Sequence, residues 1–128
     1  MDLLIDSNAL IWAFSEEARL SKRAFAAMKD PQNRLYVSHV TLYELAIKIA
    51  VHRIIPTGSS IQTILDEMRE NGFELLPIRL DHLFQLEALD LHHRDPFDRL
   101  LIAQAKIEKL AIVTADKNFK KYGLKVVW

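Results

Sequence analysis

The sequence has no cysteine and only three glycines, and each shortage excludes a class of chemistry. Without cysteine there can be no disulfide, no zinc–thiolate site and no thiol nucleophile. With so few glycines the chain cannot form a glycine-rich loop around a phosphate, and neither G-x-x-x-x-G-K-[ST] nor G-x-G-x-x-G occurs. Any catalytic or ligand-binding chemistry must therefore come from other side chains.

Long hydrophobic runs and an excess of one charge are also missing. No apolar run approaches the roughly 20 residues of a membrane span, and the N-terminus lacks the regions of a signal peptide. We therefore expect a soluble, cytoplasmic protein with no membrane partner. Seventeen basic residues balance seventeen acidic ones, so net charge identifies no partner. If several acids gather in one site, however, the remaining surface is net basic and suits a polyanion.

The 128 residues, half of them hydrophobic, are predicted to form one domain spanning the whole chain. Apolar segments predict strands at residues 3–5, 35–38, 73–78, 111–114 and 124–127. Apolar side chains at helical spacing, with capping residues, predict helices over residues 9–14, 21–29, 41–53, 60–70, 81–89 and 95–109. This alternation predicts an α/β fold, a three-layer α/β/α sandwich with a mainly parallel central sheet.

Acidic residues follow several of the predicted strands. Asp6 comes directly after the first strand, Glu44 shortly after the second and Asp116 shortly after the fourth. The pair Asp95 and Asp98 opens the long helix before that fourth strand. The carboxyl ends of parallel strands meet at one edge of the sheet, where ligands bind. Carboxylates converging there would repel one another unless a cation neutralised them, and oxygen ligands suit Mg²⁺ or Mn²⁺.

Each acid also has a purely structural explanation. Asp6 could cap the following helix, but Ser7 and Asn8 can supply that cap, which leaves Asp6 free for a ligand. Glu44 completes the pattern Thr41-x-x-Glu44, a capping box in which the glutamate binds the backbone of Thr41. Taken by itself, this pattern favours a capping role for Glu44. Its position after the second predicted strand makes a role in the site about equally well supported.

The helix starting at Asp95 contains more acid than a cap requires. Asp95 before Pro96 is a good N-cap, so Asp98, one turn along, is freer to face the site. Asp116 suits a turn as well as a ligand role. We expect the five histidines to lie in loops or packing positions, with His92 and His93 in a solvated loop, since no metal-ligand spacing links them.

Four segments, in chain order, resemble the PIN-domain ribonucleases and, more closely, the VapC-type toxins of bacterial toxin–antitoxin pairs. They are LLIDSNAL at 3–10, YELAIK at 43–48, HRDPFDRLLIAQA at 93–105 and VTAD at 113–116. Together they extend over almost the whole chain, and the stretch from 95 to 105 is the most specific.

The resemblance implies a magnesium- or manganese-dependent endoribonuclease that forms a homodimer and is blocked by a cognate antitoxin. Its implied acidic set is Asp6, Glu44, Asp98 and Asp116, with the choice between Asp95 and Asp98 as ligand left open. Ser7, Asn8 and Thr114 would support this set by hydrogen bonds. Basic residues near the predicted site edge could grip RNA phosphates, and these are Lys48, Arg53, Arg99 and Lys117.

Two rival functions also follow from the sequence. A phosphotransfer domain with a phosphorylated aspartate would need the D-x-D pattern, or paired N-terminal acids and a strand-end lysine, and the chain has neither. A catalytically weak PIN-fold module that only binds RNA or a protein partner is the other reading. Cleavage that depends on added metal would favour the nuclease over this module.

Overall fold

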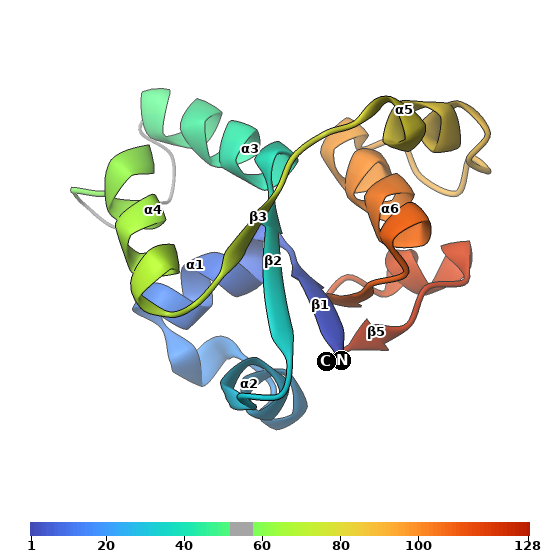
Figure 1. Cartoon of the computed structure of the whole chain (residues 1–128). Coiled ribbons are helices and arrows are strands. Elements are labelled where there is room, and N and C mark those ends of the chain that lie inside the picture. The colour runs from blue at the N-terminus through green and yellow to red at the C-terminus, as the bar shows by residue number, and fades with distance from the viewer. Residues whose placement is uncertain (52–57) are drawn as a thin grey trace.

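The computed structural model describes residues 1–51 and 58–128, and a five-stranded sheet runs through its centre (Figure 1). The strand order is β3-β2-β1-β4-β5, and all four neighbouring pairs are parallel. The strands are β1 (Asp2–Ile5), β2 (Arg34–Ser38), β3 (Glu74–Leu76), β4 (Ala111–Val113) and β5 (Val126–Val127).

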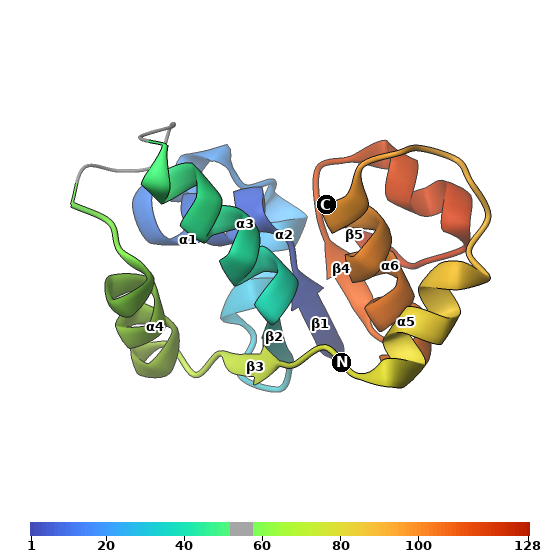
Figure 2. The same ribbon diagram turned by 90° about the horizontal axis from the view of Figure 1, so that it is seen from above.

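Helices cover both faces of this sheet. The helices are α1 (Ser7–Ser15), α2 (Lys22–Lys29), α3 (His39–Ala50), α4 (Ile61–Glu70), α5 (Leu80–Glu87) and α6 (Pro96–Glu108), with short 3₁₀ turns η1 (Glu17–Arg19) and η2 (Lys117–Tyr122). Figures 1 and 2 show α1, α2 and α4 on one side of the sheet and α5 and α6 on the other. The predicted three-layer α/β fold is confirmed. Among the described residues, no helix is long and apolar enough to cross a membrane.

The alternation of side chains along β1 creates two hydrophobic cores. Leu3 and Ile5 face the core that includes α1, α2 and α4, whereas Leu4 faces the core that includes α5 and α6. All three side chains have no exposed surface, and burying each contributes roughly 1.5–3 kcal/mol. Because the central strand is covered on both faces, its continuous apolar run is what a parallel sheet requires.

Local capping signals set most helix starts. The Ser21 hydroxyl accepts from the Ala24 amide at 3.0 Å at the start of α2, and Ser60 accepts from Thr63 at 3.1 Å at the start of α4. At α5 the sequence predicts Asp81 as the cap, and this prediction is wrong. The helix begins one residue before Asp81, with Arg79 as the N-cap, because the buried His82 ring accepts the Arg79 amide proton at 3.0 Å. Asp81 instead forms an ion pair with Arg79.

Two predictions fall on residues outside the described part of the chain. α3 is described as far as Ala50, whereas the sequence predicted a helix up to Arg53. The predicted loop residue Pro56 also lies in this segment.

The strand order reverses at β1. The chain builds β2 and β3 on one side of β1, and later β4 and β5 on the other side. In open α/β sheets such a reversal creates a crevice beyond the carboxyl ends of the strands, where ligands bind. Asp6 follows β1 and Asp116 follows β4, so the topology places both at this crevice.

Candidate metal and nucleic-acid site

Asp6 is the N-cap of α1 and lies beside two other acids. Its Oδ1 accepts from the Ala9 amide at 2.8 Å, so the expectation that Ser7 and Asn8 would free Asp6 from capping is wrong. Burial raises the pKa of Asp6, hydrogen bonds from the Thr114 hydroxyl and the Ala9 amide lower it, and nearby carboxylates raise it again. The net effect is a raised pKa, so Asp6 combines capping with a buried position in a negative environment.

Glu44 is not a helix cap. α3 begins five residues earlier, where the Ser38 hydroxyl accepts from the Val40 amide at 2.9 Å, so the predicted capping box is wrong. The Glu44 carboxylate instead accepts a hydrogen bond from the Ser7 hydroxyl at 3.1 Å and pairs with Lys48 at 3.0 Å. The Glu44 side chain therefore extends from α3 to the start of α1, where it contacts Ser7, the residue after Asp6.

Asp95 and Asp98 have different positions at the start of α6. Asp95 is the N-cap, and its Oδ1 accepts from the backbone amides of Phe97 and Asp98 at 2.9 and 3.0 Å. The side chain of Asp98 is 25% exposed and lies with the side chains of His93 and Asp116. The structure therefore places Asp98, rather than Asp95, among the other acids.

Asp116 is joined to Asp6 through Thr114. The Asp116 amide donates to the Thr114 hydroxyl oxygen at 3.1 Å, and the same hydroxyl lowers the pKa of Asp6. One oxygen of Asp116 caps η2 by accepting from the Asn118 amide at 2.9 Å. Thr114 is fully buried, so it fixes the spacing of two acids from adjacent strands. Asn8 is exposed on the first turn of α1.

Repulsion among these acids shows that they share one site. Burial, followed by the negative charges of neighbouring carboxylates, raises the pKa of Asp98 to about 7. Those carboxylates, in decreasing order of effect, belong to Asp95, Asp116, Glu44 and Asp6. The residues come from helix and strand ends far apart in the sequence, yet each affects the charge of Asp98. The four acids proposed from the sequence therefore lie in one region, in which Asp98 and Asp116, together with His93, have ligand atoms within 4.8 Å of one another.

His93 is a site residue that the sequence reasoning missed. It was expected in a solvated loop, but its side chain is 15% exposed, and Nε2 lies 3.5 Å from Asp98 Oδ2. Ligand atoms of His93, Asp98 and Asp116 all lie within 4.8 Å of one another. Its place directly before the acidic pair at 95 and 98 was the available signal, but only the fold shows that its ring turns inward.

The predicted RNA-binding residues have unequal surroundings. Lys48 is engaged by Glu44, and Lys117 is exposed at the start of η2. Arg99 is partly buried, and its guanidinium donates to the backbone carbonyls of Leu89, Asp90 and His93, so it holds the loop before α6. Arg53 lies outside the described residues.

The donor set fits a hard divalent cation. The converging groups are carboxylates, whose oxygens are the preferred ligands of Mg²⁺ and Mn²⁺. Two of them, Asp6 and Asp98, have raised pKa values because burial and mutual repulsion oppose ionisation. A bound cation reverses this effect by attracting the ionised forms. Asp98 and Asp116, together with Asp6 and Glu44, are the residues that could hold it.

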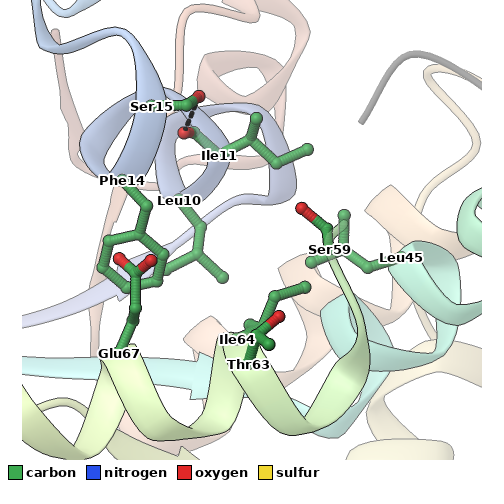
Figure 3. Close-up of a pocket in the computed structure, with 9 residues that line it drawn as sticks. All are labelled: Leu10, Ile11, Phe14, Ser15, Leu45, Ser59, Thr63, Ile64 and Glu67. Carbon is green, nitrogen blue, oxygen red and sulfur yellow. Dashed lines mark hydrogen bonds between the residues drawn. The ribbon is translucent and has the colours of Figure 1, made fainter. Parts of the chain in front are cut away.

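A separate apolar pocket lies on the same helices as the acids. Leu10 and Phe14 of α1, Leu45 of α3 and Ile64 of α4 form its walls, and Figure 3 shows their side chains converging. Leu10 is one helical turn beyond Asp6, and Leu45 is next to Glu44. None of the four candidate acids lines this pocket.

Comparison with known proteins assigns the family. The PIN-domain family profile matches residues 3–125, nearly the whole chain. The chain belongs to the PIN-domain family. PIN domains are generally nucleases that use divalent metal ions, so membership places the chain among hydrolases that act on nucleic acids. A comparison with curated proteins finds no significant sequence match.

Solved structures share the fold of this PIN domain. The structure of VapBC2 from Rickettsia felis bound to a promoter DNA fragment matches with a TM-score of 0.74 and 17% identity, covering 98% of this chain and 97% of the other. VapBC-1 from nontypeable Haemophilus influenzae matches with a TM-score of 0.66 and 15% identity, covering 98% and 96%. The PIN domain endonuclease Utp24 matches with a TM-score of 0.54 and 17% identity, covering 98% and 82%.

Proposed function

We propose that this PIN domain is a magnesium- or manganese-dependent endoribonuclease and the toxin of a toxin–antitoxin pair. The observation that carries the proposal is that Asp6, Glu44, Asp98 and Asp116 gather at the switch point of the sheet. Burial there, and after it the charge of neighbouring carboxylates, raises the pKa of Asp98 to about 7. A chain that concentrates this much negative charge needs a cation to ionise fully. The similarity to VapBC structures supports the toxin assignment.

Each acid has a distinct task in the proposed site. Asp6, Asp98 and Asp116 hold the cation, and Glu44 orients the attacking water or holds a second ion. When bound, Mg²⁺ would activate water and stabilise the charge that develops on the phosphorus oxygens and leaving group. Ser7 keeps Glu44 in place through its 3.1 Å hydrogen bond, and Thr114 keeps Asp6 and Asp116 at a fixed spacing.

We assign phosphate binding to basic side chains that lie near the acids. Lys117 is exposed beside Asp116 and is free to meet a phosphate. Lys48 would exchange its pair with Glu44 for a phosphate once a metal ion occupies the site. Arg53 remains a prediction from the sequence, and Arg99 contributes by shaping the loop that carries His93.

The decisive experiment is cleavage of an end-labelled RNA by the purified chain. We expect cleavage with Mg²⁺ or Mn²⁺, none with EDTA, and none of a DNA strand of the same sequence. Asp6→Asn should abolish cleavage while thermal stability changes little. Asp66→Asn is the matched control, because this acid lies on α4 in an exposed pair with Arg69. Full activity of Asp6→Asn would refute the site, and RNA binding without cleavage would favour the binding module.

The proposed partners are a second copy of the chain and an antitoxin. The similarity to the VapBC structures supports an antitoxin that covers the site. The apolar pocket beside Leu10 and Leu45 offers such a partner an anchor next to the acids. The protein encoded by an adjacent small gene should copurify with the chain and stop cleavage, and Ile64→Glu should weaken both effects. Sedimentation of the isolated chain tests the homodimer.

A further inference from the structure

The ring of His93 is clamped between Tyr122 and the acidic site. His93 Nδ1 lies 2.7 Å from the Tyr122 hydroxyl, and His93 Nε2 lies 3.5 Å from Asp98 Oδ2. Tyr122 ends η2 and is buried, so it fixes the ring from the side opposite Asp98. The two ring nitrogens therefore face different groups, and the position of the ring proton decides what His93 can do.

The hydrogen bonds of Tyr122 determine that position. Its hydroxyl oxygen accepts from the backbone amides of His92 and His93 at 3.2 and 3.1 Å and from Arg99 Nη1 at 3.2 Å. A hydroxyl has two lone pairs and one proton, so these donors occupy its accepting capacity. None of the three can accept the hydroxyl proton. Its acceptor is His93 Nδ1, which must be unprotonated.

The neutral ring then carries its proton on Nε2, the atom that faces the acids. This nitrogen is buried and has no hydrogen-bond partner among the residues that the structure describes. Leaving a buried donor without a partner costs free energy, so this N–H is available to a ligand or to a group that moves slightly toward it. Asp98 Oδ2, 3.5 Å away, is just outside ordinary hydrogen-bond range.

We propose that Tyr122 holds His93 as the Nε2–H tautomer and that His93 is a positioning residue, which aims this N–H at Asp98 rather than binding metal. The inference rests on the proposed nuclease function and extends it to a residue outside the four acids. A donor at this point fixes which oxygen of Asp98 remains for the cation, as groups around a metal ligand commonly do.

The competing assignment makes His93 a ligand, because one of its ring nitrogens lies within 4.8 Å of ligand atoms of Asp98 and Asp116, and Nε2 is the nitrogen that faces Asp98. Metal binding through Nε2 would require the ring proton on Nδ1, directed at the Tyr122 oxygen. That oxygen already accepts two backbone amide protons and one from Arg99. Four donors would then face one hydroxyl oxygen, and the hydroxyl proton would have no partner in this cluster.

The tautomer can be measured directly on the intact protein. Two-bond ¹H–¹⁵N correlation spectra near pH 8 distinguish Nε2–H from Nδ1–H rings, and His93→Gln identifies the signal of His93. We expect the Nε2–H pattern before and after saturation with Mg²⁺. An Nδ1–H pattern, or loss of the Nε2 proton when Mg²⁺ is added, would overturn the proposal. This measurement needs no cleavage, so it stands or fails separately from the proposed function.

Activity then tests what the N–H does. His93→Ala should lower kcat for RNA cleavage by about 10- to 100-fold with little change in KM. His93→Gln keeps an N–H donor on a chain of similar reach and should recover at least part of the loss. His92→Gln is the control, because His92 is exposed, its ring packs edge-on against Tyr122 with the ring centroids 4.8 Å apart, and it is not grouped with Asp98 and Asp116. Equal loss in His93→Gln and His93→Ala would contradict a donor role, whereas an inactive wild-type chain would refute the nuclease proposal itself.

Discussion

Glu44 and Asp98 lie in one acidic site but have opposite surroundings. Glu44, on α3, accepts a hydrogen bond from Ser7 and pairs with Lys48 at 3.0 Å. Asp98, on α6, has other carboxylates around it, and its pKa is raised to about 7. Lys48 thus neutralises Glu44 on the α3 side of the site. Asp98, on the α6 side of the site, has no such lysine or arginine partner among the residues that the structure describes and stands among other carboxylates. A cation bound from solution should therefore depend most on the α6 side.

The largest expected effect is that of Asp98→Asn. We expect the rate of RNA cleavage to fall by more than about 100-fold, because the substitution removes a proposed metal ligand as well as the charge that attracts the cation. Initial rates at saturating Mg²⁺ measure the loss, with Asp66→Asn as the control. Wild-type activity in Asp98→Asn would show that the α6 side does not carry the chemistry.

Glu44→Gln should have a smaller effect. An amide keeps the hydrogen bond with Ser7 but loses the charge, and we expect a fall of about 10- to 100-fold. The same assay, with the affinity for Mn²⁺ measured by calorimetry, separates weaker metal binding from slower cleavage. A loss as large as that of Asp98→Asn would show that the two sides are equivalent.

The stability of the metal-free protein should decrease as pH rises. The folded-state pKa of Asp98 is raised to about 7 from an ordinary 3.8, so the folded chain binds this proton more tightly than the unfolded chain. The resulting stabilisation is complete below the ordinary pKa and is lost as pH rises through 7. We expect the Tm to fall by about 5 °C or more between pH 5 and pH 8.

Two comparisons isolate this effect in calorimetric scans. Asp98→Asn should reduce the pH dependence, and the raised pKa of Asp6 leaves a remaining dependence of the same sign. Excess Mg²⁺ at pH 8 should restore the lost Tm, because a ligand that binds only the folded chain stabilises it. A wild-type Tm that is unchanged between pH 5 and pH 8 would refute the claim that the surroundings of Asp98 raise its pKa.

Lys48→Met should have the smallest effect on stability. The pair between Lys48 and Glu44 has i,i+4 spacing on α3 and is partly exposed, so it contributes about 0.5 kcal/mol. Urea denaturation at pH 7 measures this difference. A loss of more than about 2 kcal/mol would mean that Lys48, and not Ser7, holds Glu44 in place.

The fold was largely predictable because its signals are local. The strands at 3–5 and 111–114, and the caps at Ser21, Ser60 and Asp95, depend on side chains a few residues away. The predictions failed where a distant group or an earlier cap intervened. α3 starts at the Ser38 cap and not at Thr41, and Asp6 itself caps α1.

The sequence alone determined the order of strands and helices and singled out four acids as candidates, since hydrophobic periodicity and position after a strand are properties of short segments. Only the tertiary structure decided which groups meet. It separated Asp98 from Asp95, released Glu44 from its expected capping box, and turned His93 inward against Tyr122. His93 and Tyr122 are 29 residues apart, and the packing of η2 against the start of α6 brings them together. The position of the His93 ring proton follows from its contact with Tyr122. No pattern in a short segment of the sequence predicts that contact.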